Sequence, residues 1–322
     1  MSRILVTGGA GFIGSHLCER LLERGDRVTV LDNFNDFYDP TIKRANAEVL
    51  AQAGARVVTG DFRDAELVAG LFDEGAFEAI VHLGAMAGVR PSLLDPLLYE
   101  DVNVRGTLVL LEAVRKRDPG LRFIFASSSS VYGSNENVPF KEADDIHHPV
   151  SPYAATKRAG ELMCYTFHHL YQIPITCLRF FTVYGPRQRP EMAIHKFVRM
   201  TLRGEPIPFF GDGSTRRDYT YVDDITSGVV RAIDRCRGYD IFNLGESETT
   251  SLADLVTQVG EACGREPQID RQPMQPGDVL LTHADISRAR EHLGYAPSTL
   301  IPEGLARFVA WYREQGLDGP AQ

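Results

Sequence analysis

The sequence predicts an α/β fold, a doubly wound parallel sheet followed by a smaller C-terminal domain. Three observations predict it. Short runs rich in β-branched residues alternate with amphipathic stretches through the first 180 residues, which is typical of βαβ units in a sheet covered on both faces. A glycine-rich turn joins the first run to the first amphipathic stretch, and proline- and glycine-rich loops end the alternation after residue 180.

Each predicted strand is a short apolar run, and each predicted helix is a longer stretch with helical periodicity. We expect strands at residues 3–7, 27–31, 56–59, 79–83, 122–126 and 175–180, and helices at 12–23, 65–72, 99–117 and 152–171. A further apolar run at 241–244 is expected to return to the same sheet. The predicted domains are residues 1–180, with 221–245 returning to them, and residues 181–322.

Composition narrows the class of protein. The net charge of −9 provides no global basic field and argues against a nucleic-acid partner. No apolar run approaches the ~20 residues that span a bilayer, and the first strand begins too early for a signal peptide to precede it, so we expect a cytoplasmic protein without a membrane segment. The five cysteines are scattered without Cys-x-x-Cys spacing, which predicts neither disulfides nor a metal site.

The glycine-rich turn predicts a dinucleotide site. Glycines stand at positions 8, 11 and 14, directly after the first strand and at the start of the first helix. Gly8 permits a tight turn, Gly11 lets the backbone approach a pyrophosphate, and Gly14 lets the helix pack closely on the strand. The positive end of the helix then faces the negative charge.

An acidic residue at the end of the second strand predicts which dinucleotide binds. Asp32 follows Gly11 by 21 residues, where a carboxylate can accept hydrogen bonds from the adenosine ribose and repel a 2′-phosphate. We therefore expect NAD rather than NADP, although an aspartate can also merely cap a strand end. Asp61, after the third strand, could receive the adenine amino group or cap the next helix, and the residues leave both readings open.

A tyrosine and a lysine predict redox chemistry at a carbinol carbon. Tyr153 and Lys157 are four residues apart, so they share a face of the predicted helix. A nearby ammonium group and a positive nicotinamide both favour the phenolate, which would lower the pKa of Tyr153 from about 10 towards the range where a general base works. Spacing alone also fits an ordinary surface pair. The run of serines from Ser127 to Ser130, at the end of a predicted strand, favours the catalytic interpretation because it supplies hydroxyl donors for the substrate.

Five motifs together resemble the extended short-chain dehydrogenase/reductase family, and most closely its UDP-glucuronate 4-epimerase branch. They are TGGAGFIG, SSSSVYG, SPYAATK, FFTVYGPRQRPEMA and FGDGSTRRDYTYVDD, and they span nearly the whole chain. The resemblance implies a Rossmann sheet and a catalytic triad of Ser128, Tyr153 and Lys157. It also implies an NAD site formed by Gly8, Gly11, Phe12, Ile13, Gly14, Asp32, Asn33, Asp61, Phe62, Leu83, Ala85 and Asn103 together with the triad's tyrosine and lysine.

The residues beside the triad bear on which reaction follows oxidation of the sugar. Nucleotide-sugar 4,6-dehydratases carry acidic residues next to the catalytic hydroxyl, and UDP-glucuronate decarboxylases carry a glutamate nearby. This chain has Ser129 and Ser130 there. Because a serine hydroxyl is a poor acid or base near pH 7, dehydration is disfavoured. Reversible oxidation at C4, which is epimerisation, remains.

A glucuronate substrate brings a hazard, since its 4-keto form is a β-keto acid that loses carbon dioxide readily. We expect Ser129, Ser130 and Thr182, with Arg189 adding charge, to hold the carboxylate away from the orientation that permits this loss. Thr182 replaces the asparagine typical of UDP-galactose 4-epimerases. The alternatives are a UDP-glucose or UDP-N-acetylhexosamine 4-epimerase, a UDP-glucuronate decarboxylase, and a non-catalytic NAD-binding regulator.

The second domain is expected to bind the UDP part of the substrate. By resemblance, Arg217 contacts the diphosphate, which an arginine fork suits, and Asp278 contacts the ribose. Glu191 and Arg216 depart from the usual residues of the branch. Arg187 is either a solvated loop charge or a functional residue.

The resemblance further implies a homodimer that pairs the helices at 99–117 and 152–171 into a four-helix bundle, which apolar residues such as Leu108, Leu111 and Val114 permit. The histidines are expected to be structural, because those considered have no partner at metal-ligand spacing. They are His82, His147, His148 and His195.

Overall fold

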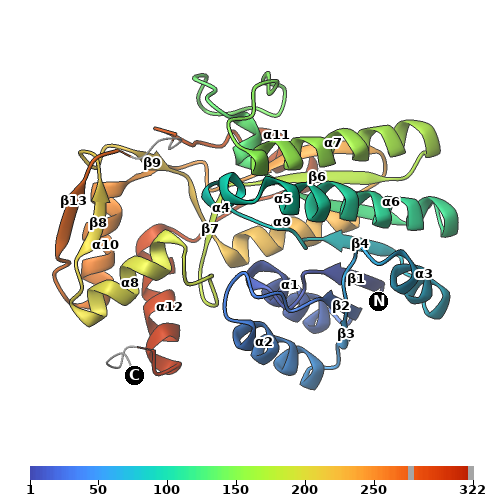
Figure 1. The fold of residues 1–322 in the computed structure, drawn as a ribbon, viewed down its shortest axis with the longest axis horizontal. Coiled ribbons are helices and arrows are strands. Elements are labelled where there is room, and N and C mark those ends of the chain that lie inside the picture. Colours follow the sequence, from blue (N-terminus) through green and yellow to red (C-terminus); the bar gives the residue numbers. More distant parts are fainter. Residues whose placement is uncertain (275–278, 318–322) are drawn as a thin grey trace.

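A seven-stranded parallel sheet forms the centre of the protein and confirms the predicted α/β fold (Figure 1). The computed structural model describes residues 1–274 and 279–317. The strand order is β11-β6-β5-β4-β1-β2-β3. The strands are β1 (Arg3–Thr7), β2 (Arg27–Asp32), β3 (Arg56–Thr59), β4 (Ala79–His82), β5 (Arg122–Ser128), β6 (Ile175–Phe180) and β11 (Tyr239–Leu244).

The strand order reverses beside β1. The chain passes from β1 to β2 and β3 on one side and then crosses to β4 on the other side. The connections that leave β1 and β4 therefore diverge at the carboxyl edge of the sheet, which is where ligands of such sheets bind. The glycine-rich turn follows β1 directly and lies at this switch point.

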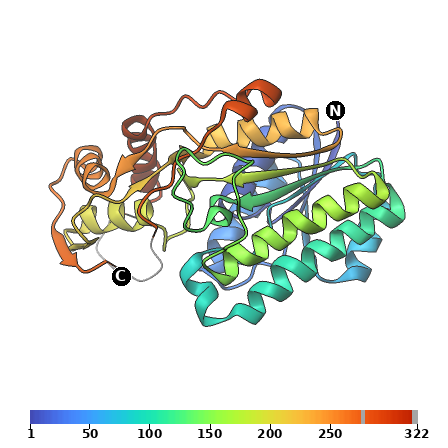
Figure 2. The ribbon, with the colours of Figure 1, turned by 90° about the horizontal axis from the view of Figure 1, so that it is seen from above.

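Helices cover both faces of the sheet, as the all-apolar strands require (Figure 2). One face packs against α1, α2 and α9, and the other against α3, α6 and α7. Their bounds are α1 (Phe12–Glu23), α2 (Pro40–Gln52), α9 (Val222–Arg235), α3 (Ala65–Glu74), α6 (Gly106–Arg117) and α7 (Pro152–Tyr171). In Figure 1, α7 and α6 lie in the upper part of the molecule and α1 and α2 in the lower part.

The helix predicted at 99–117 is more complex than the sequence pattern indicated. It is built from α5 (Pro96–Glu100), a π-helical turn η1 (Asp101–Arg105) and α6. Pro96 starts the helix after the cap Asp95, whose side chain accepts from the backbone of Leu98. The π turn shifts the helical phase by about one residue, which a simple 3.6-residue periodicity cannot reveal. Other predicted bounds also move: β2 continues to Asp32, α3 to Glu74 and β5 to Ser128, whereas β4 ends at His82 and β11 begins at Tyr239.

The second region holds short strands and helices beside the carboxyl edge of the main sheet. Its two-stranded sheets pair β10 with β7, β12 with β9, and β13 with β8. The remaining elements are β7 (Thr182–Tyr184), β8 (Ile207–Phe210), β9 (Arg216–Arg217), β10 (Tyr219–Tyr221), β12 (Thr250–Ser251), β13 (Ile269–Gln272), α4 (Val89–Leu94), η2 (Ser129–Tyr132), α8 (Ala193–Arg203), α10 (Leu252–Cys263), α11 (Ser287–Leu293) and α12 (Ile301–Glu314). Among the described helices, none is both long and apolar enough to cross a membrane.

Candidate active site

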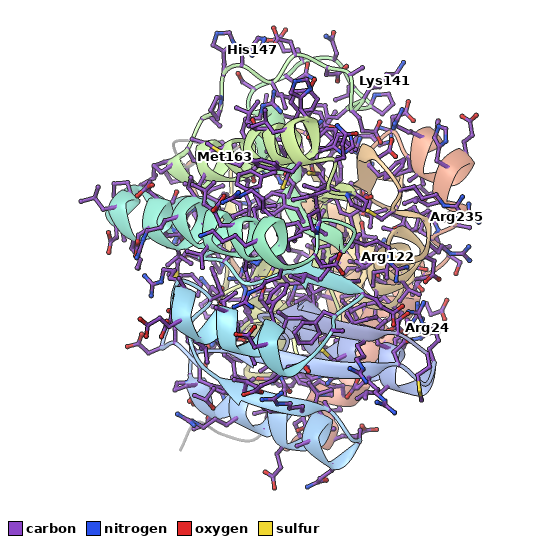
Figure 3. The ribbon with its side chains drawn as sticks, turned by 90° about the vertical axis from the view of Figure 1, so that its right-hand side faces the viewer. Arg24, Arg122, Lys141, His147, Met163 and Arg235 are labelled. Atoms are coloured by element: carbon purple, nitrogen blue, oxygen red, sulfur yellow. The ribbon has the colours of Figure 1, made fainter. Side chains whose placement is uncertain are left out.

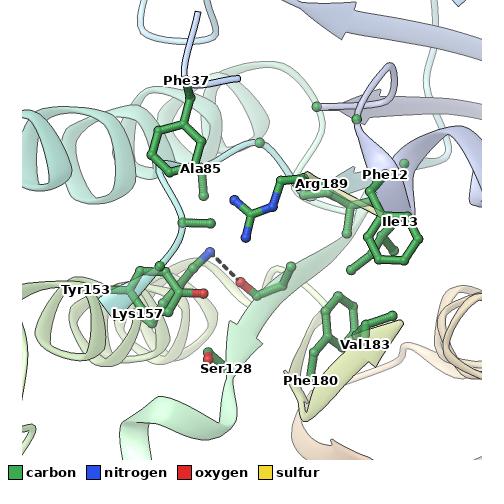
Figure 4. Close-up of a pocket in the computed structure, with 18 of the residues that line it drawn as sticks. Phe12, Ile13, Phe37, Ala85, Ser128, Tyr153, Lys157, Phe180, Val183 and Arg189 are labelled. Atoms are coloured by element: carbon green, nitrogen blue, oxygen red, sulfur yellow. Dashed lines mark hydrogen bonds between the residues drawn. The ribbon is translucent and has the colours of Figure 1, made fainter. Parts of the chain in front are cut away.

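A cavity of about 360 Å³ opens at the carboxyl edge of the sheet (Figure 4). Its wall brings together most of the side chains that the sequence singled out from distant segments. These are Gly8, Gly11, Phe12, Ile13, Gly14, Asp32, Asn33, Phe62, Leu83, Ala85, Ser128, Ser129, Ser130, Tyr153, Lys157, Thr182 and Arg189. Asp61, Asn103 and Arg217 are not part of this wall, and Asp278 lies outside the described residues.

The glycine turn forms a cradle that leaves no room for side chains. Gly8 has a φ of +67°, and a Cβ placed there would lie 2.8 Å from the Cα of Gly84. A Cβ at Gly14 would overlap the carbonyl oxygen of Gly8. The cap residue of α1 is Gly11, and among residues 1–274 and 279–317 no side chain caps this N-terminus. The first amides of α1 therefore face the cavity with capacity for an anionic group, which fits a dinucleotide pyrophosphate.

Asp32 ends β2 with its carboxylate on the cavity wall. The backbone N–H of Phe34 donates to Oδ1 at 2.9 Å, and that of Ala10 donates to Oδ2 at 3.2 Å. Burial raises the pKa of Asp32, and these two donors and the charge of Lys43 oppose that rise. Each carboxylate oxygen keeps a second lone pair that can accept from a hydroxyl.

Asp61 is engaged within the protein. Its carboxylate accepts from Arg63 and from the amide of Asn33 at 2.9 Å. Burial raises the pKa of Asp61, but these hydrogen bonds outweigh it and bring the pKa to about 2. The next helix is capped by Asp64, which accepts from the backbone of Glu66 and Leu67. Of the two readings that the sequence left open, the cap therefore belongs to Asp64, and the adenine contact of Asp61 stays a prediction.

Asn103 lies in the π turn, buried behind the cavity wall. Its side chain accepts from the backbone N–H of Met86 at 2.8 Å and donates to the Met86 carbonyl at 3.0 Å. It also donates to the hydroxyl of Thr156 on α7 at 3.0 Å. Asn103 thus ties the loop after β4, which carries Ala85, to the helix that carries Tyr153.

Two elements bring the predicted catalytic side chains together. Ser128 is the last residue of β5. Helix α7 begins at Pro152 because Ser151 caps it, accepting from the backbone of Ala154. Tyr153 therefore lies in the first turn and Lys157 one turn later. The Lys157 ammonium donates to the carbonyl of Ala126 at 2.8 Å, the dashed line in Figure 4, which joins α7 to β5.

Burial dominates the acidity of this pair. Burial raises the pKa of Tyr153, while its hydrogen bond with Ser128 and the charge of Arg189 lower it. Burial lowers the pKa of Lys157 to about 8. In the protein alone the pKa of Tyr153 is therefore raised, with burial as the largest cause and the Lys157 ammonium directed at a backbone carbonyl. The lowering expected from Lys157 and the nicotinamide together stays a prediction.

The groups predicted to hold a sugar carboxylate line the cavity near Tyr153. Ser129 and Ser130 form the turn η2, where the backbone N–H of Ser130 donates to Oγ of Ser128 at 3.1 Å. Thr182 begins β7 on the neighbouring wall. Figure 4 shows the guanidinium group of Arg189 pointing into the cavity towards Tyr153 and Lys157. Its face lies 5.5 Å from the ring centre of Phe37, and its Nε pairs with the carboxylate of Glu191 at 3.3 Å.

The comparisons with known proteins place the chain in a family. A family model described as GDP-mannose 4,6 dehydratase matches residues 5–308. The chain belongs to this family. UDP-glucuronate 4-epimerase 1 of Arabidopsis thaliana is 45% identical over 327 residues, which cover 96% of this chain and 76% of the relative.

Solved structures agree in fold along almost the whole chain. The UDP-glucuronic acid 4-epimerase of Bacillus cereus, in complex with UDP-glucuronic acid and NAD, superposes with a TM-score of 0.91 at 35% identity and covers 97% of this chain and 99% of its own. The UDP-glucose 4-epimerase of Thermotoga maritima, with UDP-glucose, gives 0.89 at 34% identity, with 97% and 99% covered. The predicted resemblance to extended short-chain dehydrogenases/reductases is confirmed.

Sequence reasoning missed part of the cavity wall of this member of the GDP-mannose 4,6 dehydratase family. The loop after β2 contributes Phe37 and Tyr38, and α2 contributes Lys43. The Lys43 ammonium donates to Oδ1 of Asn35 at 2.7 Å and lies over the Tyr38 ring at 4.9 Å. The sequence did contain an indication of this part of the wall, because two aromatic residues follow a strand that ends at the carboxyl edge of the sheet.

Arg187 is not a solvated loop charge. Its guanidinium group forms a two-pronged ion pair with Glu19 of α1 at 2.9 and 2.5 Å. Arg217 lies on β9 and donates to the carbonyl of Arg216 at 2.9 Å.

The histidines take the positions expected of structural residues or remain at the surface. His82 is buried and bonds the hydroxyls of Thr7 and Thr107, whereas His147 lies on the outer loop labelled in Figure 3. Within residues 1–274 and 279–317, no group of three or more His, Cys, Asp or Glu side chains is arranged to hold a metal ion.

Proposed function

We propose that this protein interconverts UDP-glucuronate and UDP-galacturonate by reversible oxidation at C4 of the sugar, with NAD as its resident cofactor. One observation carries the proposal. The hydroxyl of Ser128, the phenol of Tyr153 and the ammonium of Lys157 share one cavity with the glycine cradle and Asp32. The relatives named UDP-glucuronate 4-epimerase, and the Bacillus cereus complex with UDP-glucuronic acid and NAD, support the choice of substrate and cofactor.

The cofactor half of the site uses the backbone more than side chains. The cradle of Gly8, Gly11 and Gly14 takes the pyrophosphate, and Asp32 accepts from the adenosine ribose and disfavours a 2′-phosphate. When bound there, NAD would serve as the acceptor and then the donor of the hydride at the sugar carbon. The remaining residues proposed for this half are Phe12, Ile13, Asn33, Asp61, Phe62, Leu83, Ala85 and Asn103.

Tyr153 moves the proton. Its phenolate takes the proton of the C4 hydroxyl, and the phenol gives it back when the 4-keto sugar is reduced on its opposite face. Ser128 hydrogen-bonds the same oxygen and stabilises the phenolate, which burial disfavours. The buried charge of Lys157 adds to this because charges interact strongly in a site that excludes water.

Four side chains orient the sugar carboxylate. Decarboxylation of the 4-keto sugar requires the breaking bond to stand perpendicular to the ketone plane, so a carboxylate held in another orientation survives. The hydroxyls of Ser129, Ser130 and Thr182 and the guanidinium group of Arg189 line the cavity for this purpose. An arginine can bind both carboxylate oxygens at once, which fixes the orientation of the group.

The UDP half belongs to the second domain. In this division, residues 1–180 with 221–245 hold the cofactor, and residues 181–322 mainly hold the UDP-sugar. We assign Arg217 to the diphosphate and Asp278 to the ribose by resemblance to the branch. The position of β11 within the main sheet is consistent with the return of 221–245.

The working form is a homodimer in the cytoplasm. Leu111 and Val114 of α6 are buried in the core and do not form the dimer face. The outer surface of α5 and α7 instead exposes apolar side chains, with Leu97 79%, Leu162 48% and Tyr165 52% exposed, and such a surface is typical of an association face. The five cysteines are all free and buried, which suits a reducing compartment.

The substrate assignment is tested by supplying sugar without cofactor. Purified protein is incubated with UDP-glucuronate and no added NAD, and the products are followed by proton NMR. We expect the galacto epimer to accumulate without a UDP-pentose. Pentose formed as fast as epimer would indicate a decarboxylase, preferential conversion of UDP-glucose would indicate a neutral-hexose epimerase, and no conversion of either sugar would contradict the proposal.

A further inference from the structure

The loop that carries Arg189 is hydrogen-bonded to α1, the helix whose N-terminus faces the cavity. Pro186, Arg187 and Gln188 precede Arg189 in this loop, which follows β7. His16 and Glu19 lie on α1, one and two turns after the glycine cradle. The Arg187 guanidinium group contacts both of them, at 3.1 Å to Nδ1 of His16 and at 2.5 and 2.9 Å to the Glu19 carboxylate.

The hydrogen bonds define the state of His16. Its Nε2 lies 2.9 Å from the carbonyl oxygen of Pro186, which can only accept, so Nε2 carries the hydrogen. Its Nδ1 faces a donor, the Arg187 guanidinium, and must accept. Burial and the charge of Arg187 lower the pKa of His16 to about 4, so the ring is neutral and bridges the loop backbone and the arginine.

The backbone of Arg187 is strained. Its φ is +63°, in the left-handed region that side chains other than glycine and asparagine rarely adopt. Strain of this kind persists where surrounding contacts over-determine the conformation, and it is common at functional sites. The contacts to α1 supply the restraint.

The same loop is also hydrogen-bonded to β7 and to α8. The buried amide of Gln188 donates to the carbonyl of Val183 at 3.0 Å and accepts from the backbone of His195 at 3.0 Å. The His195 ring donates to the Gln188 carbonyl at 2.6 Å. Arg189 follows directly, so these contacts hold the backbone that carries it, while its side chain also pairs with Glu191 at 3.3 Å and stacks on Phe37.

We infer that His16, Glu19 and Arg187 form an interdomain clamp that positions Arg189 for the uronate carboxylate and so contributes to the choice of a charged over a neutral sugar. The inference rests on the proposed function and deepens it. Arg187 does not line the cavity, so it acts as a positioning residue through Arg189. The clamp also couples the pyrophosphate-binding helix to the loop that receives the sugar.

Glu19→Gln tests the clamp, because it removes the carboxylate charge from Arg187 and keeps the side-chain size. Binding of UDP-glucuronate and of UDP-glucose is measured by calorimetry, alongside kcat, KM, bound NAD and melting temperature. We expect affinity for UDP-glucuronate to fall by about tenfold, since displacement of a positioned group by a fraction of an ångström is costly. Affinity for UDP-glucose and the NAD content should stay unchanged, and the UDP-pentose fraction should rise.

The matched control is Glu23→Gln, an exposed glutamate one turn later on the same helix, which should change neither affinity. Arg187→Gly, which relieves the backbone strain, should lower uronate affinity as Glu19→Gln does, and the double variant should lose no more than either single variant. Equal losses for both sugars, no loss for either, or additive losses in the double variant would overturn the clamp.

The binding measurement separates this inference from the proposed function. If the wild-type protein binds but does not convert UDP-glucuronate, the proposed function fails and the binding ratio still tests the clamp. If the wild type converts UDP-glucuronate and Glu19→Gln keeps the wild-type binding ratio, only the clamp is wrong. A wild-type protein without preference for the uronate in binding also overturns it.

Discussion

Tyr153 and Lys157 lie one helical turn apart, and burial moves their pKa values in opposite directions. The pKa of the phenol rises and that of the ammonium falls to about 8. Both shifts favour neutral side chains, so the site disfavours the charged forms that the chemistry needs. Enzymes commonly accept such a loss of stability at an active site in return for function.

Lys157→Met tests this trade-off. Removal of a buried charge should abolish epimerisation and raise the melting temperature, on the order of 4 °C for a protein of this size. Below the folded-state pKa of about 8, wild type carries the whole cost of burying the ammonium. Between pH 8 and the unfolded value of about 10.5 the unfolded chain binds more protons, so wild-type stability rises with pH.

The difference in melting temperature between variant and wild type should therefore narrow from pH 7 to pH 10, as scanning calorimetry can measure. A difference that stays constant or widens over this range would show that the cost is not the buried charge.

At the scale of elements, the packing of α1 on β1 is set by glycine. A Cβ at Gly14 would overlap the backbone of Gly8 and Gly9, and backbone cannot move aside as a flexible side chain can. The separation of helix and strand therefore depends on this residue type, and so does the position of the amides that face the cavity.

Gly14→Ala should lower the free energy of unfolding by about 1–3 kcal/mol through overpacking and leave the purified protein with little bound NAD. Gly70→Ala is the matched control, because Gly70 lies inside α3 and a Cβ there meets nothing within 4 Å. It should raise the free energy of unfolding by about 0.5–1 kcal/mol. Stoichiometric NAD in Gly14→Ala, read from absorbance after release, would contradict the cradle.

A buried ion pair fixes α7 against the sheet. Glu161, one turn after Lys157, accepts from Nε of Arg179 at 2.8 Å and from the hydroxyl of Ser127 at 2.6 Å. Both charged side chains are almost completely buried. The contacts join the helix of Tyr153 to the strand that ends in Ser128.

Glu161→Gln should lower the free energy of unfolding by about 3–5 kcal/mol, because it leaves the Arg179 charge buried and unpaired. Arg158→Gln removes a more exposed partner of the same carboxylate and should cost less than about 1 kcal/mol. Urea denaturation of both variants measures the two losses. Similar losses would mean that burial of the pair does not matter.

For the molecule as a whole, local sequence patterns predicted those features of the fold that depend on neighbouring residues in the chain. The strand at 3–7, the helix at 12–23 and the helix at 152–171 have the predicted bounds, because each begins or ends at a glycine, a cap or a proline visible in the sequence. The glycine cradle and the placement of Tyr153 and Lys157 one helical turn apart were likewise predicted from the sequence.

Long-range contacts could not be read in this way. The pairing of Arg187 with Glu19 joins residues 168 positions apart, and no local pattern indicates it. The direction of the Lys157 ammonium towards Ala126 depends on how α7 packs against β5. The π turn in the predicted 99–117 helix responds to tertiary packing rather than to local propensity.

The proposed dimer is tested on the apolar surface of α7. Leu162→Lys places a charge in the expected interface and should convert a dimeric wild type to a monomer, as measured by light scattering after gel filtration. Val49→Lys on α2 is the control, since Val49 is 50% exposed outside that surface. A monomeric wild type, or a Leu162→Lys variant that remains dimeric, would contradict the assigned face.

The most direct test of the account removes one oxygen atom. Tyr153→Phe is compared with Tyr171→Phe, an exposed tyrosine at the end of the same helix, by NMR of UDP-glucuronate turnover on enzyme-bound NAD. We predict that Tyr153→Phe keeps the fold and the bound NAD but loses epimerisation by about 10²–10⁴-fold, while Tyr171→Phe keeps wild-type activity. Epimerisation by Tyr153→Phe at the wild-type rate would show that the phenol does not move the proton.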